Sequence, residues 1–243
     1  MESSKIQSKE DEDKFWQANY DARVRYFEDK VGPLPGDIMK MMNMMGVWPG
    51  GGLFVIPAPK LGRDLSVYTT FGFTNSDMPT SVQAAAQPPV MSGGRPTQWQ
   101  STLSRKEPAP QRPGAAGYGY EIMMVAQSGL AWPLNFLQWT VRAEINHDAG
   151  LLDRVEKYDG LTVEKIEVGG NDKMAINVLI AKAQAPLPTG AQLPAGSMEI
   201  LVATTITEEE MRWTMQHGRG ILVSKLAEAG VGQISAPGRG SAV

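Results

Sequence analysis

Apolar and polar residues alternate with the two-residue period of a β-strand over four segments of this chain. These segments are 65–73, 118–126, 161–168 and 174–180. Because successive side chains of a strand point to opposite faces of a sheet, this period predicts strands with at least one buried face. In the segment 161–168 the apolar positions change phase between Val163 and Ile166, which indicates a β-bulge.

One strand-to-helix segment near the C-terminus is predicted to be the centre of the fold. Ile200–Ala203 is apolar in both phases, so this strand should be covered on both faces. Thr207 and Glu210 have the spacing of a capping box, and three glutamates fill the first turn of the helix that follows. Gly218 and Gly220 interrupt the apolar stripe of that helix, so we expect it to bend or break there.

A period of three to four residues predicts further helices. One is predicted from Asp13 to Val31, on a stripe formed by Trp16, Tyr20, Val24, Phe27 and Val31. Another should begin at Trp132-Pro133, because proline is favoured in the first turn of a helix.

The methionine-rich segment 37–45 is predicted to be a short helix that begins after Asp37. Its thioethers would suit a copper(I) site or an adaptable binding surface. We interpret the segment instead as a helix packed on the core, because methionine is usually buried.

Two segments rich in glycine and proline are predicted to be loops. Trp48–Gly52 contains three glycines, but the Lys and Ser/Thr of a phosphate-binding loop do not follow, so we interpret it as a plain turn. Residues 80–117 lack any period, which predicts a mobile Pro/Gly-rich insertion. A partner-binding role for this basic segment stays open, although we interpret it as a solvated insertion.

Strands interleaved with only a few helices predict one α+β domain with a mixed or antiparallel central sheet flanked by helices. The domain is expected to span residues 13–232, with 80–117 as its insertion. A disordered N-terminus, 1–12, should precede it, and a flexible tail, 233–243, should follow it.

Composition narrows the functional classes. The 243 residues include no cysteine, which excludes disulfides, thiolate nucleophiles and cysteine-based metal sites. A net charge of −3 gives no basis for binding nucleic acid or an anionic membrane surface. The charged N-terminus is unlike a signal peptide and no apolar run is long enough to span a membrane, so a cytoplasmic location is expected.

Residues for catalysis or metal binding are few. Glu210 and His217 are two helical turns apart and could form an acid–base or metal-binding pair. A metal site needs three or four ligands, however, and the chain has only two histidines, His147 and His217. Helix capping explains the glutamates 208–210. We therefore predict no catalytic, metal-binding or cofactor-binding residue and expect no cofactor, and we do not expect an enzyme.

Five short motifs occur in an order that resembles the suppressor of fused (SUFU-like) domain family, in its bacterial single-domain type. They are Trp48-Pro49-Gly50-Gly51-Gly52, Tyr68-Thr69-Thr70-Phe71-Gly72-Phe73-Thr74, Gly119-Tyr120-Glu121-Ile122, Ala131-Trp132-Pro133-Leu134-Asn135-Phe136-Leu137-Gln138 and Ile206-Thr207-Glu208-Glu209-Glu210-Met211. The motifs span residues 47–229, with the long loop as an insertion.

The resemblance implies a non-enzymatic protein-interaction domain with a protein partner. In animals, larger two-domain members sequester a transcription factor, and that partner is not carried over to this shorter chain. Similar single-domain bacterial proteins are thought to be immunity proteins that neutralise a toxin, which is the function we expect. The motifs resemble core positions, so the partner-binding residues are unknown, as is the oligomeric state. An enzyme with an unrecognised active site and an oligomeric scaffold stay open as alternatives.

Overall fold

The computed structural model describes residues 9–43, 46–78, 80–86, 88, 90–92, 95–98, 101–169 and 174–243. Within these ranges nine strands form the central sheet: β1 (Met39–Asn43), β2 (Gly46–Pro57), β3 (Leu65–Phe71), β8 (Ala115–Gln127), β9 (Leu161–Glu167), β10 (Ala175–Lys182), β11 (Gly190–Leu193), β12 (Gly196–Ile206) and β13 (Ile234–Ser235). Their order is β1-β2-β3-β8-β12-β10-β9, with β11 paired to β12 and β13 paired to β8.

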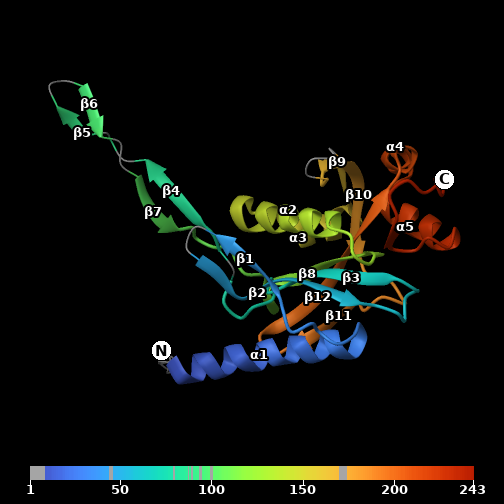
Figure 1. The fold of residues 1–243 in the computed structure, drawn as a ribbon, viewed down its shortest axis with the longest axis horizontal. Coiled ribbons are helices and arrows are strands. Elements are labelled where there is room, and N and C mark those ends of the chain that lie inside the picture. The colour runs from blue at the N-terminus through green and yellow to red at the C-terminus, as the bar shows by residue number, and fades with distance from the viewer. Residues whose placement is uncertain are drawn as a thin grey trace.

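The pairing makes the sheet mixed. β12 and β13 run parallel to β8, and the other neighbours are antiparallel. Figure 1 shows the helix α1 (Lys9–Lys30) below the sheet and the helices α2 (Trp132–His147) and α3 (Leu151–Tyr158) above it. The predicted α+β class, with a mixed central sheet flanked by helices, is confirmed.

The strand β12 lies in the middle of the sheet, as its sequence predicts. Leu201 and Ala203 pack with the core under α2 and α3, whereas Ile200 and Val202 pack with the core over α1. All four side chains are fully buried. Burying a side chain as large as those of Ile200, Leu201 or Val202 contributes about 1.5–3 kcal/mol. This strand therefore stabilises both cores.

The capping box after β12 is also confirmed. Thr207 accepts a hydrogen bond from the Glu210 amide at 3.1 Å, and the Glu210 carboxylate accepts one from the Thr207 amide at 2.8 Å. The helix α4 (Glu208–His217) begins there and ends at Gly218, whose φ of 93° breaks it from the helix α5 (Arg219–Glu228). The predicted break at the glycines is therefore present.

The predicted bulge in β9 is present as well. Ile166 pairs with Ile176 and Val163 pairs with Val178, so two residues of β9 lie opposite one residue of β10. Lys165, inside the bulge, has a φ of 52° and its amide donates to Asn177 Oδ1 at 2.9 Å.

The first two strands differ from the sequence prediction. Met39 lies opposite Leu53 and Lys40 opposite Gly52, so the segment predicted as a helix over 37–45 contains β1, and Trp48–Gly52 lies inside β2. A Cβ on Gly52 would stand 2.4 Å from the Met39 carbonyl oxygen, so glycine allows the edge strand to approach. The predicted helix and turn are both wrong, because pairing between strands decides the backbone here. Met44 and Met45 lie outside the described residues.

The segment 80–117 also has more structure than predicted. β4 (Val82–Ala86) pairs with β7 (Ser101–Arg105), and β5 (Val90–Ser92) pairs with β6 (Arg95–Gln98). Figure 1 shows these two hairpins following one another and projecting from the body; residues 80–106 are called the arm below. Alanine, glutamine and serine are the main residues of its strands. The strands therefore lack the alternation of apolar and polar residues that would predict them.

Both ends of the described chain are more ordered than the sequence indicates. The helix α1 begins at Lys9, so residues 9–12 form its first turn instead of a disordered terminus; residues 1–8 lie outside the described part. In the segment 233–243, expected to be a flexible tail, the Ser235 hydroxyl accepts from the Thr205 amide at 3.0 Å and donates to the Ala203 carbonyl at 3.3 Å. Its strand β13 pairs with β8 just beyond the point where β12 stops pairing with β8.

Replacing Gly117 by alanine should destabilise the fold far more than the same change at Gly129. Both glycines have positive φ, 54° and 79°, so each change costs about 1 kcal/mol of backbone strain. At Gly117 the new Cβ would also stand 2.1 Å from the Phe73 carbonyl oxygen, whereas nothing lies within 4 Å at Gly129. Urea unfolding should show an additional loss of about 1–3 kcal/mol for Gly117→Ala; equal losses would contradict this packing.

Candidate functional site

The arm is anchored at its root to the C-terminal end of α2. The Lys106 amide donates to the Ser81 carbonyl at 2.9 Å, which closes the base of the hairpin. The Lys106 ammonium group donates to the Ile145 carbonyl at 3.2 Å and to Asp148 Oδ1 at 2.5 Å. A cation is favourable at the negative end of a helix dipole, so this lysine holds the arm to the body.

A cavity of about 340 Å³ lies at the root of the arm. Tyr118, Tyr120, Glu144 and Asp148 are among the residues that line it. The buried Glu144 carboxylate accepts from the Tyr120 hydroxyl at 2.9 Å and from the amides of Gly150 and Leu151 at 3.1 and 3.0 Å. These amides open α3, so Glu144 caps a helix that has no side-chain cap of its own.

Both tyrosines of the cavity stay protonated. Burial raises the pKa of Tyr118 and of Tyr120, and the negative charge of Glu144 raises both further. Tyr120 is thus a hydrogen-bond donor to Glu144 at ordinary pH. The described contacts make this pair a structural bond rather than an acid and base free to act on a substrate.

A second network joins α1 to the sheet. Glu121, on β8, is fully buried and accepts four hydrogen bonds from the end of β3 and the residues that follow it. The donors are the Thr70 hydroxyl at 2.7 Å, the Gly72 amide at 2.9 Å, the Thr74 amide at 3.0 Å and the Thr74 hydroxyl at 2.7 Å. A buried carboxylate is stable only when its oxygens are bonded in this way.

Arg23 of α1 supplies the opposite charge. Its guanidinium nitrogen Nη1 lies 3.8 Å from Glu121 Oε1, and its Nη2 donates to Asn75 Oδ1 at 2.7 Å. The guanidinium also lies over the Phe71 ring, 4.1 Å from the ring centre. Burial lowers the pKa of Arg23 and the Glu121 charge opposes that effect, and an arginine stays charged in either case.

Glu210 is tied to the C-terminal segment. Arg239 donates to both of its oxygens, at 2.6 and 2.7 Å, and the Ala242 amide donates to Oε1 at 2.8 Å. Burial raises the pKa of Glu210, but Arg239 and the amides of Thr207 and Ala242 lower it by more, so this pKa lies below the usual range of a glutamate. Capping therefore explains only part of what Glu210 does.

The residues considered for catalysis from the sequence do not meet. His217 is exposed, stacks on Trp213 at 4.1 Å between ring centres, and is bonded through Nδ1 to the Trp213 carbonyl, whereas Glu210 faces Arg239. His147 is exposed at the end of α2, and the Trp48 side chain lies outside the described part. Among the residues that the structure describes, no three His, Asp or Glu side chains are grouped to hold a metal ion.

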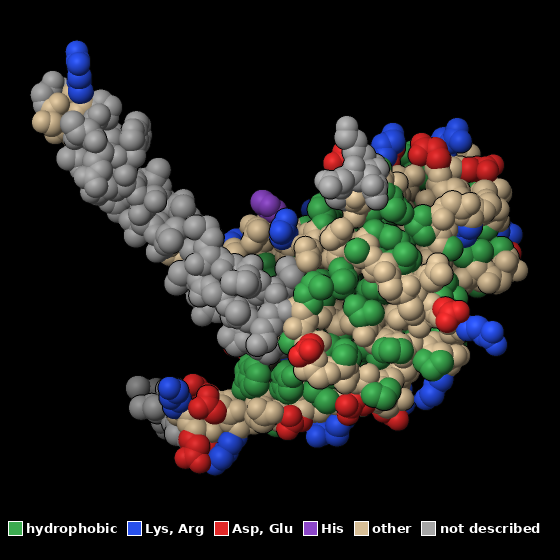
Figure 2. All heavy atoms as spheres, viewed as in Figure 1, with side chains coloured by type: hydrophobic (Ala, Val, Ile, Leu, Met, Phe, Trp, Pro, Cys, Tyr) green, Lys and Arg blue, Asp and Glu red, His purple; other side chains and the backbone are tan. Residues whose placement is uncertain are grey.

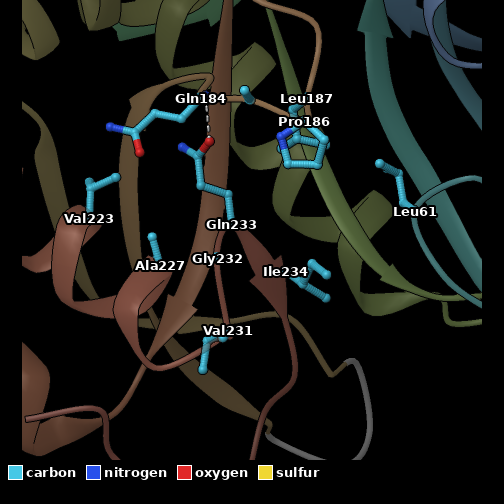
Figure 3. Close-up of a pocket in the computed structure, with 12 residues that line it drawn as sticks. Leu61, Gln184, Pro186, Leu187, Val223, Ala227, Val231, Gly232, Gln233 and Ile234 are labelled. Atoms are coloured by element: carbon cyan, nitrogen blue, oxygen red, sulfur yellow. Dashed lines mark hydrogen bonds between the residues drawn. The ribbon is translucent and has the colours of Figure 1, made fainter.

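A further cavity, of about 270 Å³, lies between α5 and the segment that precedes β11. Figure 3 shows the Gln233 side chain between Val223 on one side and Leu187 on the other. Gln233 accepts from the Gln184 amide at 2.7 Å and donates to the Lys182 carbonyl at 3.0 Å. With both ends of this amide bonded, the cavity offers mainly apolar surface and suits an apolar group.

The outer face of α2 exposes apolar side chains close to the edge strand β1. Trp139 is 38% exposed and stacks on Phe136 at 6.0 Å between ring centres, and Met39 is 43% exposed. Gln138 brings the two elements together, because its Nε2 donates to Met39 Sδ at 3.7 Å. Sequence patterns could not predict this surface, because Met39 comes near α2 only through the unpredicted pairing of β1 with β2.

Replacing Arg239 by methionine should destabilise the protein in a pH-dependent way. The depressed pKa of Glu210 contributes stability that is present above the unfolded-state pKa and is lost as pH falls through the lower folded-state pKa. We expect a loss of roughly 3 kcal/mol at pH 7 that shrinks as the pH falls below about 4.5.

The control for this prediction is Lys225→Met, which removes an exposed ion pair with Glu228 and should cost at most about 0.5 kcal/mol. Urea unfolding of both variants between about pH 3 and pH 7 measures the difference. If the stability lost in Arg239→Met does not change with pH, the ion pair with Glu210 is not the cause of that loss.

The fold of this chain is similar to those of solved suppressor of fused structures. The structure resembles a suppressor of fused homologue from Neisseria gonorrhoeae, with a TM-score of 0.55 and 14% identity over 95% of this chain and 97% of that one. It also resembles a chain of the Sufu–Fu complex, with a TM-score of 0.54 and 14% identity over 93% and 91% of the two chains.

Drosophila Suppressor of Fused gives the same TM-score, 0.54, at 14% identity; the match covers 93% of this chain and 50% of that longer protein. At this identity the likeness shows the fold alone. No curated protein matches the sequence. No helix in the described ranges is long and apolar enough to cross a membrane.

The model of the suppressor of fused protein family matches residues 49–240. That interval contains Glu121 and Glu210 themselves, and its fold is that of the solved relatives. The chain therefore belongs to the suppressor of fused protein family.

Proposed function

We propose that this chain is a non-enzymatic protein-binding domain that acts in the cytoplasm as a bacterial immunity protein and neutralises a toxin by binding it. The observation that carries the proposal is the exposure of Trp139 on α2 and of Met39 on β1, two elements that the bond from Gln138 to Met39 joins. A partly exposed tryptophan held in place by a neighbouring ring is the kind of anchor that dominates many protein interfaces.

The hydrogen bonds of the buried carboxylates also support a binding function rather than catalysis. Glu121, Glu144 and Glu210 each accept hydrogen bonds from backbone amides and from a further side chain. These carboxylates hold the fold together and are not free to act as acids or bases. The Sufu–Fu complex among the solved relatives is consistent with a protein partner, although the partner of this chain is a separate question.

The alternative of an enzyme has one observation in its favour. The cavity of about 340 Å³ at the root of the arm is lined by the tyrosines 118 and 120 and by carboxylates, and it is large enough for a small polar molecule. A small-molecule ligand bound there would favour this alternative.

The partner test uses the toxin-like product of a neighbouring gene, co-produced with this chain. We expect a stoichiometric complex and restored growth of the host. Trp139→Ala should weaken the complex by about thirtyfold or more, because a buried interface tryptophan commonly contributes 2 kcal/mol or more. Calorimetry on the purified pair measures the change.

The matched control is Met215→Ala on α4, whose side chain is 73% exposed on another part of the surface. It should leave binding and growth unchanged. If no neighbouring gene product binds, the immunity function is wrong. Binding that is indifferent to Trp139→Ala would instead rule out the α2 face as the binding surface.

A further inference from the structure

Two elements leave the body of this protein with little packing against it. Among the first ten residues of α1 only Trp16 is partly buried, and the first fully buried residue is Asn19. The strands of the arm pair only with one another within the described ranges. Figure 1 shows both elements projecting on the same side of the molecule, where they diverge. Short lone helices and two-stranded hairpins are marginal in water, so both would be stabilised by a partner.

The inner face of α1 turns acidic where the body no longer supports the helix. Helical spacing places Glu12 and Asp13 on the same stripe as Trp16, which donates from its indole nitrogen to Asp77 at 3.1 Å. Further along this stripe Arg23 is fully buried against the sheet. Glu12 and Asp13 are exposed, and the neighbouring Phe15 is 40% exposed. The projecting half of α1 therefore offers carboxylates beside an aromatic side chain.

The arm has the opposite charge. Residues 80–106 contain Arg95, Arg105 and Lys106 and no acidic residue, in a chain whose net charge is −3. Lys106 is used at the root of the arm in its bond with Asp148. Arg95 begins β6, in the hairpin farthest from the body, and is exposed together with Met91, which is 56% exposed. Figure 2 shows a basic side chain, in blue, at the far end of the arm.

We propose that two copies of this chain associate through these surfaces, the arm of each lying along the projecting half of α1 of the other. Arg95 of one copy then faces Glu12 and Asp13 of the second, and Met91 covers Phe15. A two-fold axis uses each surface once on each copy, so the contact closes at a dimer. The occupant is a second copy because this chain carries both halves of the complementary pair.

This inference goes beyond the proposed binding function and does not depend on it, because it concerns the purified chain alone. Sedimentation equilibrium of the full 243-residue chain measures the dimer in about 50 mM and 500 mM salt. We expect a dimer whose dissociation constant rises about tenfold or more at the higher salt, because exposed opposite charges are screened. Arg95→Glu should weaken the dimer at least tenfold at low salt.

A charge exchange keeps the test specific. Glu12→Arg alone should also weaken the dimer, and Arg95→Glu combined with Glu12→Arg should restore it. Lys225→Glu, on the exposed surface of α5, is the matched control and should change nothing. A monomer at about 100 µM in low salt would overturn the proposal. So would a dimer that Arg95→Glu leaves unchanged, or one that the charge exchange does not restore.

Discussion

A glutamate buried in the sheet, Glu121, fixes the positions of β3 and α1 relative to β8. Glu121 is removed from water on β8, so its negative charge is tolerated only where donors and a cation surround it. The donors all come from the segment Thr70–Thr74, and the cation is Arg23 of α1. One carboxylate therefore fixes the end of β3 and the position of the first helix together.

The contacts of Glu121 also position one of the surfaces that we assign to binding, the arm. The segment bonded to Glu121 continues through Asn75 to the root of the arm, and Asn75 accepts from Arg23. Gly117 allows β8 to pass close to the Phe73 carbonyl, so the outgoing and returning ends of the insertion lie together. The interior of the domain is thus built around family motifs, whereas its candidate binding surfaces lie on α2, β1, α1 and the arm.

Local sequence patterns predicted the elements whose cause is local. Ile200–Ala203 shows its burial in its own composition, and the Thr207–Glu210 cap is complete within four residues. The sequence does not predict the helix α3, because it has only eight residues, flanked by Gly150 and Asp159 in left-handed conformations. Its cap, Glu144, lies on another helix. The β1–β2 pair was missed because contacts between strands override the local pattern.

The candidate site was less predictable than the fold, since its residues are distant in sequence. Glu121 belongs to a recognised motif, but its partners lie up to 98 residues away, at Arg23. One signal was available: Arg23 is four residues from Asn19 and from Phe27, on the buried stripe of α1, where a lone charge requires a partner. Nothing local could place Met39 beside α2 or Arg239 on Glu210.

The most direct test of this account is a double-mutant cycle on Arg23 and Glu121, measured by urea unfolding of Arg23→Met, Glu121→Gln and the double variant. Each single change should cost about 3–5 kcal/mol, because it leaves a buried charge or a donor without its partner. The double variant should cost less than the sum of the single losses by about 1–3 kcal/mol. Losses that add to within about 0.5 kcal/mol would contradict the claim that the two residues form one unit.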